Sequence, residues 1–469
     1  MNPLIKSSQT PWVIGLLTSL IVLGVYLPVI HNGFVDWDDT SVILLDPSIR
    51  DGSGNHLWQI IQDHLTLKYS RVTPLTYIFY TFLYALSGGQ PFAFHLASLV
   101  VHLLNVYLVF WFAYLCSSRT SIAFGTALLF GIHPMNVEPV AWVSAMSNVL
   151  FACFYLLTLI LFLIGEMKPT QRPTYRVLSI LAYTLSLLST AIAVTLPIVL
   201  ILIDYLQKKR LSAASMISKS SYFLLAFVFG ILALFAASHS QEIPDPYLTS
   251  NIYSLAQRTN LSIFAIWFYL KQILIPYPLC AIYPIVLYEH QPFIYYNIAF
   301  MILLTCIFFI PRLAPINPHQ RYLRFGTLFF LSTLILFLHI NGVTESIISD
   351  RYAYIPSLGI FFMLSYFIVQ SPEKIKRYLL ALCVVGIISL CVVTRAQIAV
   401  WKNTATLWTP VIEQYPRAFP ANLSRGNYWY SQGNLEKALE DYETVLRLKP
   451  QNTKALRMKE KILLQLKNR

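Results

Sequence analysis

Residues 91–116, PFAFHLASLVVHLLNVYLVFWFAYLC, form a run of apolar side chains without a single Asp, Glu, Lys or Arg. A helix needs roughly 20 such residues to cross the hydrocarbon core of a bilayer, so we expect this run to span a membrane. Seven further runs have the same character, apart from Arg324 in one of them: Trp12–Ile30, Trp142–Ile164, Tyr222–Ser238, Pro292–Ile310, Leu323–Asn341, Tyr352–Val369 and Tyr378–Thr394. The sequence therefore predicts an all-α polytopic membrane protein.

The composition of the 469 residues agrees with this fold class. Hydrophobic residues make up 56% of the chain and charged residues only 12%, whereas soluble domains carry roughly 25% charged residues. The net charge of +13 would suggest nucleic acid in a soluble chain, but basic loops of a membrane protein account for much of it, and we expect no nucleic-acid partner. The six cysteines lie in apolar sequence without metal-ligand spacing, so we expect them to pack as small apolar side chains.

The positions of Lys and Arg predict the topology, because basic residues in short loops mark the cytoplasmic face. All basic loops fall on one side only if Pro74–Leu86 lies along the outer face or is re-entrant, and if residues 238–291 begin and end outside. About eleven crossings then remain, including three shorter ones at Ser121–Pro134, Val177–Thr190 and Ile192–Leu206. The N-terminus is expected in the cytoplasm, and residues 401–469 outside it.

Two parts of the chain differ in charge. Residues 401–469 hold 12 Lys/Arg and 6 Asp/Glu, far more than the apolar residues 1–400 hold per unit length. Pro416 and Pro450 end similar segments 34 residues apart, which is the period of a tetratricopeptide repeat. The residues between them match the small, aromatic and turn positions of that repeat: Gly426, Trp429, Gly433, Ala438 and Tyr442. We therefore expect a short tetratricopeptide domain after the membrane domain.

Three polar segments converge on the predicted outer face and carry the candidate site residues. The outer loop 32–73 contains Asp36-Trp-Asp-Asp39, in which Asp38 or Asp39 could deprotonate a hydroxyl nucleophile or bind a divalent ion. Glu138 lies before the next span, where a role as a helix-start acid is an equally good explanation. Arg351 in Ser349-Asp-Arg-Tyr could bind a lipid phosphate, with interfacial anchoring as the alternative.

The order of these motifs resembles the C-class glycosyltransferases of membranes, specifically the transmembrane and tetratricopeptide-repeat-containing O-mannosyltransferases and their bacterial relatives. The matching pieces extend over nearly the whole chain: Gly33-Phe-Val-Asp-Trp-Asp-Asp39, Arg71-Val-Thr-Pro-Leu-Thr76, Phe94-His-Leu96, Val101-His-Leu-Leu104, His133-Pro through Trp142, Thr195-Leu-Pro197, Asp350-Arg-Tyr-Ala-Tyr-Ile-Pro-Ser357, and Trp401 through Trp408.

The resemblance implies a polyprenyl- or dolichyl-phosphate sugar donor, with mannose as the sugar, and transfer to a hydroxyl of a protein or glycan at the non-cytoplasmic face. It places the catalytic role on Asp38, with Asp39 and Glu138 as further candidates, and donor phosphate binding on Arg351 and Arg71. The same three carboxylates would hold a divalent metal ion if the enzyme uses one. The expected location is a bacterial inner membrane, or the endoplasmic reticulum in a eukaryote, with the repeat domain outside the cytoplasm and open to a protein partner.

The chain departs from the family pattern at two places. Where relatives carry charged residues after the Glu-containing motif, this chain has Met146, Ser147 and Asn148, and it has Thr190-Ala191 where many relatives carry Lys-Glu. A changed donor, a changed acceptor or lost activity are all compatible with these neutral residues.

Two other functions stay open on the sequence. A lipid-sugar transporter or flippase should place ionisable groups and broken helices at mid-membrane, and His95, His102 and Pro197 are the inner candidates. A non-catalytic assembly scaffold would keep the repeat domain without needing Asp38.

Overall fold

A computed structural model of the chain describes residues 10–50, 57–66, 68–69, 71–209, 212–239, 253–283, 293–308, 318–338 and 348–468. Throughout these ranges the regular secondary structure is helical, as the apolar runs predicted. Four helical segments are long and apolar enough to cross a membrane: Pro11–His31, Pro91–Ser117, Val143–Met167 and Glu373–Val400. Five shorter apolar helices accompany them: Thr120–Ile132, Ala191–Leu206, Ser220–Ala236, Phe293–Thr305 and Ser357–Gln370. The expected all-α membrane fold class is confirmed, and the count of about eleven crossings stays a prediction.

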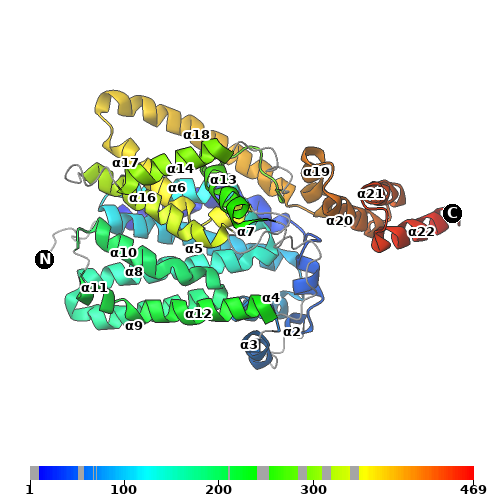
Figure 1. Ribbon diagram of the computed structural model, residues 1–469, viewed down its shortest axis with the longest axis horizontal. Coiled ribbons are helices and arrows are strands. Elements are labelled where there is room, and N and C mark those ends of the chain that lie inside the picture. The colour runs from blue at the N-terminus through cyan, green and yellow to red at the C-terminus, as the bar shows by residue number, and fades with distance from the viewer. Residues whose placement is uncertain are drawn as a thin grey trace.

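The helices form a bundle whose long members run along one axis (Figure 1). Helix α8 (Met146–Met167) is central, because 78% of its most apolar window is buried, and α5 (Pro91–Ser117) and α9 (Arg172–Ser189) pack against it. Helix α18 (Glu373–Val400) is peripheral, with 6% of its window buried. Many of its leucine, valine and isoleucine side chains between Ile375 and Val392 face outward, which suits contact with lipid rather than water, whereas Ile398 near its end is buried.

Helices α16 (Pro318–Leu334) and α17 (Ser357–Gln370) approach each other at backbone distance. A Cβ atom added to Gly326 would lie 2.5 Å from the carbonyl oxygen of Gly359. Only glycine permits this approach, and small residues are a common means of packing helices inside membranes.

The two ends of the bundle differ in their loops (Figure 1). The short helix α11 (Ala213–Ile217) lies at one end, after α10 (Leu196–Leu206), and the C-terminal helices lie beyond the other. Lys209 follows α10 and forms an ion pair of 2.6 Å with Glu166 at the end of α8, so the basic loop 168–176 lies at the α11 end as well. We refer to this end as the basic end and to the opposite one as the site end.

Two predicted spans begin earlier in the sequence than the helices that form them. The span predicted at Tyr352–Val369 begins too early, because Asp350–Ala353 form a short 3-10 turn and α17 starts at Ser357, directly after Pro356. The span predicted at Trp142–Ile164 also begins too early, since α8 starts at Met146. Pro356 suits the position before a helix because it has no backbone N–H to donate, and the residues before both helices form short 3-10 turns at the site end.

Two helices cover the site end without running along the bundle axis as full spans. Helix α4 (Pro74–Ser87) has 14 residues and covers only about 21 Å at 1.5 Å per residue, less than the hydrocarbon thickness. Helix α13 (Leu255–Leu274) is seen end-on in Figure 1, so it lies across the bundle. Its Ser262 and Tyr269 hydroxyls donate to the carbonyl oxygens of Leu338 and Ser349. The membrane sidedness of both helices stays a prediction.

The C-terminal helices extend away from the bundle (Figure 1); the later ones have a small core of their own, whereas Leu407, Trp408 and Val411 of the first pack into the core of the bundle. They are α19 (Thr404–Gln414), α20 (Phe419–Ser431), α21 (Leu435–Leu448) and α22 (Thr453–Lys467). Ala438 and Tyr442 are fully buried, and Gly433 has a φ of +74°, a left-handed conformation that glycine adopts at little cost. Helical hairpins of this kind suit the expected tetratricopeptide repeat, which stays a prediction.

Candidate active site

Asp39 is fixed in the loop that follows the first helix, α1 (Thr10–Tyr26). Its Oδ2 accepts a hydrogen bond from the backbone N–H of Val35 (3.0 Å), and its Oδ1 accepts two from Ser144, one from the backbone N–H (2.9 Å) and one from the hydroxyl (2.5 Å). Burial raises the pKa of Asp39 to about 6, although these three bonds lower it in part. Because both carboxylate oxygens of Asp39 already accept hydrogen bonds, this side chain is better suited to holding the loop in place than to accepting a proton from a substrate.

Asp38 is the half-buried neighbour of Asp39 and lies within electrostatic range of Arg351. Its side chain is more exposed than that of Asp39, which is almost fully buried. Asp36 is also half-buried, but it lies two residues further than Asp38 from the anchored position. The placement agrees with the assignment of Asp38 as the base, which stays a prediction.

Glu138 and Arg351 form a buried ion pair between two loops of the site end. The guanidinium Nη1 of Arg351 pairs with Oε1 of Glu138, and the backbone N–H of Arg351 donates to Oε2 at 3.0 Å. The side chains are 12% and 2% exposed. Burial alone would lower the pKa of Arg351, but Tyr352, Glu138 and Asp38 together raise it above its ordinary value, so the guanidinium stays charged. Glu138 thus holds Arg351 in place, and its carboxylate is engaged.

Aromatic rings complete the surroundings of Arg351. Its Cζ lies 4.9 Å from the ring centroid of Trp142, 4.8 Å from that of Tyr352 and 6.0 Å from that of Trp37, distances typical of cation–π contacts. Trp37 lies between Asp36 and Asp38 and stacks on Trp142, with centroids 4.4 Å apart and planes at 12°. Arg351 is therefore packed directly against the loop that carries Asp38.

Asp350 is a second buried carboxyl in the same region. It accepts a hydrogen bond of 2.9 Å from the hydroxyl of Tyr283 and is 2% exposed. Burial, followed by repulsion from Glu138, raises the pKa of Asp350 well above its usual range. A protonated Asp350 would leave Glu138 as the charged partner of Arg351.

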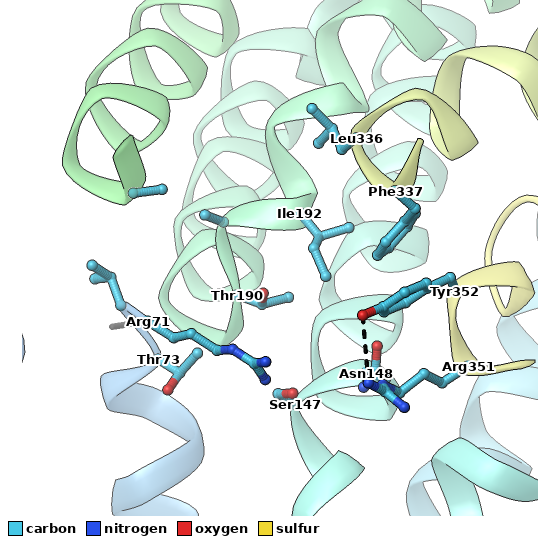
Figure 2. A pocket seen from close by; sticks show the side chains of 13 residues that line it. Arg71, Thr73, Ser147, Asn148, Thr190, Ile192, Leu336, Phe337, Arg351 and Tyr352 are labelled. Atoms are coloured by element: carbon cyan, nitrogen blue, oxygen red, sulfur yellow. Dashed lines mark hydrogen bonds between the residues drawn. The ribbon is translucent and has the colours of Figure 1, made fainter. Parts of the chain in front are cut away.

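A cavity of about 270 Å³ opens beside this assembly and brings the two predicted phosphate-binding residues together (Figure 2). Arg71 lies on one side of it, and Arg351 on the other, with its Nη2 donating to the hydroxyl of Tyr352 at 3.4 Å (Figure 2). The remaining described lining residues are Val72, Thr73, Ser147, Asn148, Thr190, Ala191, Ile192, Ala233, Leu336 and Phe337. None of the described lining residues is acidic, so the cavity combines two cations, hydroxyl and amide groups and an apolar wall.

The positions at which the chain departs from its expected family lie in this cavity. Ser147 and Asn148 are in the first turn of α8, and Thr190 and Ala191 are in the break between α9 and α10; all four line the cavity. Met146 is buried beside them and faces the core, where its sulfur accepts from Ser98. A ligand in this cavity would therefore meet neutral side chains at these four positions.

Sequence reasoning missed Ser144 and the stacking of Trp37 on Trp142. Ser144 is 105 residues from its partner Asp39, and nothing in the local sequence links the two. The sequence did contain a signal for the stacking. Trp37, Trp142, Trp401 and Trp408 each lie next to a predicted span, and tryptophans in such positions tend to lie at the same membrane interface.

The three carboxylates predicted as metal ligands do not form a ligand cluster in this arrangement. Across the described ranges, no group of three or more His, Cys, Asp or Glu side chains has metal-binding geometry. Asp39 is occupied by Ser144 and Val35, and Glu138 by Arg351. A divalent metal ion as cofactor stays a prediction.

Of the two inner histidines that would support a transporter, His102 has hydrogen-bond partners at both ring nitrogens, whereas His95 has one among the described residues only at Nε2, 3.4 Å from the carbonyl oxygen of Gly33. Nδ1 of His102 lies 2.7 Å from the hydroxyl of Tyr354, and Nε2 lies 3.1 Å from the carbonyl oxygen of Gly131.

A second cavity, of about 550 Å³, lies between α1 and α5. It is lined mainly by apolar residues of these two helices, among them Trp12 and Tyr107. Its described lining residues suit lipid chains and include no charged group for a phosphate.

Comparison with known proteins gives partial similarities. No protein-family model matches the chain. Protein O-mannosyl-transferase TMTC1 of Mus musculus is 30% identical over 129 residues, which cover 26% of this chain and 14% of that protein. TMTC1 of Homo sapiens is 25% identical over 174 residues, which cover 34% of this chain and 20% of that protein. The chain therefore matches a fifth or less of the length of these curated relatives.

Among solved structures, ArnT from Cupriavidus metallidurans bound to undecaprenyl phosphate is similar with a TM-score of 0.44 and 13% sequence identity, over 97% of this chain and 78% of that one. The resemblance that the motifs predicted is confirmed as a weak sequence similarity to the TMTC1 O-mannosyl-transferases.

Proposed function

We propose that the chain is an integral membrane glycosyltransferase that transfers a sugar, mannose, from a polyprenyl phosphate to a hydroxyl acceptor. The observation that carries the proposal is the position of Arg351, which lines the cavity and also packs against Trp37 in the acidic loop. A phosphate in the cavity would face two guanidinium groups, which match phosphate oxygens well. The apolar wall of Ile192, Leu336 and Phe337 suits the first isoprene units of a lipid. The O-mannosyl-transferases that share sequence with the chain support the same reaction class.

The reaction proposed here is a single inverting displacement. Asp38 accepts the proton of the acceptor hydroxyl, the acceptor oxygen forms a bond to the anomeric carbon, and the bond from that carbon to the phosphate oxygen breaks. The electron pair leaves with the polyprenyl phosphate, whose charge Arg71 and Arg351 stabilise. A sugar phosphate already carries a good leaving group, so one base suffices and no acid partner is required.

A transfer assay tests the proposal. Purified protein in detergent or liposomes is incubated with hydroxyl acceptors and radiolabelled polyprenyl-phosphate mannose. Polyprenyl-phosphate glucose serves as the alternative donor, and polyprenyl phosphate without a sugar as the control. We expect label to move from the lipid to the acceptor with inversion at the anomeric carbon. Hydrolysis or export of the lipid-linked sugar without transfer would contradict the proposal. A chelator in the same assay tests for a divalent metal ion.

The acceptor proposal concerns the C-terminal helices. We propose that they present a Ser- or Thr-bearing protein segment to the site, since helical repeats bind extended peptides and raise their effective concentration. Removing residues 419–469 should lower transfer to a protein acceptor more than transfer to a small soluble alcohol. Equal loss on both acceptors would show that these helices only stabilise the fold.

The sidedness proposal places the site end and the C-terminal helices outside the cytoplasm, opposite the basic loops. The substitution Ser431→Cys provides a probe, because Ser431 is exposed at the end of α20. Labelling in intact cells by a membrane-impermeant reagent is expected in a background without the accessible native cysteines. Labelling only after the inner membrane is permeabilised would contradict this topology.

A further inference from the structure

The loop that carries Asp38 is hydrogen-bonded to the junction between α18 and α19, more than 360 residues away in the chain. The side-chain amide of Asn32 donates to the carbonyl oxygen of Ile398 (3.2 Å), and the backbone N–H of Gly33 donates to that of Lys402 (2.9 Å). The backbone N–H of Asp36 donates to the hydroxyl of Thr404 at 2.8 Å. Successive residues of the loop thus lie along the junction.

The hydroxyl of Thr404 is held in a fixed place. Thr404 is 2% exposed and is the first residue of α19. Asn403 caps that helix, because its side chain accepts from the backbone N–H of Thr406 at 3.0 Å while its own N–H donates to the Thr406 hydroxyl at 3.0 Å. A capping box of this kind fixes the direction in which a helix begins.

Aromatic packing reinforces the same contact. Trp37 stacks on Trp401 with centroids 6.4 Å apart and planes at 14°, and it contacts Trp408 at 5.3 Å. Trp401 and Trp408 are each 1% exposed and belong to the junction and to α19. The residue before Asp38 is therefore enclosed between the bundle and the start of the C-terminal helices.

These contacts leave Asp38 between two anchored residues. Asp36 is tied to Thr404 on one side, and Asp39 is tied to Ser144 and Val35 on the other. A base must lie within hydrogen-bonding reach of the proton it accepts, so small displacements of such a loop reduce the rate without weakening donor binding.

We propose that Thr404 is a positioning residue for Asp38, acting through the N–H of Asp36. The start of the C-terminal helices is then a structural component of the catalytic loop as well as a connection to the acceptor-presenting helices. The proposal rests on the proposed function for its kinetic consequence, but its structural consequence, an ordered loop at residues 33–39, can be measured without any activity.

The test uses the full-length protein and compares two variants. Thr404→Val removes the hydroxyl that accepts the hydrogen bond from the Asp36 N–H, and Thr404→Ser keeps a hydroxyl there. A net hydrogen bond of about 0.5–1.5 kcal/mol corresponds to a rate effect of about two- to twelvefold. We expect kcat to fall by about that factor in Thr404→Val, with donor KM unchanged, and to recover in Thr404→Ser. Hydrogen exchange at the Asp36 amide should become faster in Thr404→Val alone.

Thr409→Val is the matched control, because it removes a hydroxyl of the same helix that bonds to Ala405 and Arg425 instead of to the loop. It should lower stability slightly and leave both loop exchange and kcat unchanged. Unchanged exchange at Asp36 in Thr404→Val would overturn the proposal, as would equal losses of kcat in Thr404→Ser and Thr404→Val. If exchange changes as expected but the wild-type protein transfers no sugar, the positioning contact stands and the proposed function fails.

Discussion

The two ends of the helix bundle each contain a buried ion pair, but the pairs differ in what they connect. At the basic end, Lys219 and Asp204 lie 15 residues apart in sequence, 2.5 Å apart in space, and are each 2% exposed. At the site end, Arg351 and Glu138 are 213 residues apart in sequence. The first pair closes a local turn around α11, whereas the second brings together two distant loops.

The surroundings of the two pairs point to different roles. Ser215 donates to Asp204, and Lys209 lies 3.6 Å from the same carboxylate, so the charges at the basic end are compensated by their own neighbours. Arg351 is also paired, yet it lines a cavity opposite Arg71, in which none of the described lining residues is acidic. An ion pair whose charges are compensated locally, such as Lys219–Asp204, stabilises the fold. The Arg351–Glu138 pair lies beside a second cation, so it can stabilise the fold and also help to bind an anion.

The largest expected effect is on catalysis at the site end. Asp38→Asn removes the proposed base with little change in volume, so kcat for sugar transfer should fall by about 10²–10⁴-fold while thermal unfolding is unchanged. Asp36→Asn is the matched control, because its side chain is also half-buried but its backbone N–H makes the contact with Thr404. If Asp36→Asn lost activity and Asp38→Asn did not, Asp38 could not be the base, and another residue would have to be assigned that role.

The next effect is on stability at the basic end. Lys219→Met leaves the buried carboxylate of Asp204 without its nearest cation, and breaking a buried pair typically costs about 3–5 kcal/mol. Thermal unfolding in detergent should therefore occur at a lower temperature, while kcat per folded molecule stays the same. Adding Asp204→Leu should restore part of the stability. A reduced kcat with normal stability would show that the two ends do not differ as proposed.

A smaller effect is expected on donor binding. Arg71 lines the cavity opposite Arg351, so its guanidinium is placed to meet a phosphate there, and Arg71→Ala should raise the donor KM by about tenfold or more. Arg71→Lys should recover part of this loss, since it keeps the charge but not the planar fork. Arg119→Ala removes a basic side chain at the other end, bonded to Gln370, and should leave KM unchanged. Similar KM values for the alanine variants would exclude a specific role for Arg71.

The smallest effect is a pH dependence of stability. Because the pKa of folded Asp39, about 6, lies above the ordinary value of 3.8, the folded state holds a proton more tightly than the unfolded state. This contribution to stability is complete below pH 4 and is lost as the pH rises through 6. Asp39→Asn should flatten the change of melting temperature between pH 4 and 6. An unchanged slope would show that Asp39 is not buried as described.

The sequence was sufficient to predict the helical membrane fold, because apolar runs of membrane length and the basic loops are local patterns. It also predicted that the loops containing Asp38, Glu138 and Arg351 converge, since charge topology placed them on one face. It could not predict that Glu138 would pair with Arg351, because that contact joins α7 (Val137–Ala141) to the turn Asp350–Ala353, 213 residues further along the chain. The anchoring of Asp39 by Ser144 and of Asp36 by Thr404 likewise joins residues that no sequence pattern connects.

The central claim is that the charged cavity between Arg71 and Arg351 holds a polyprenyl phosphate, and photo-crosslinking tests it most directly. A polyprenyl phosphate that carries a photoreactive group on its first isoprene unit is irradiated with the wild-type protein and with Arg71→Ala, and the modified peptides are identified by mass spectrometry. The account predicts adducts on the apolar wall at Ile192, Leu336 or Phe337, and fewer of them in Arg71→Ala. Adducts confined to the apolar groove between α1 and α5, equal in both proteins, would contradict it.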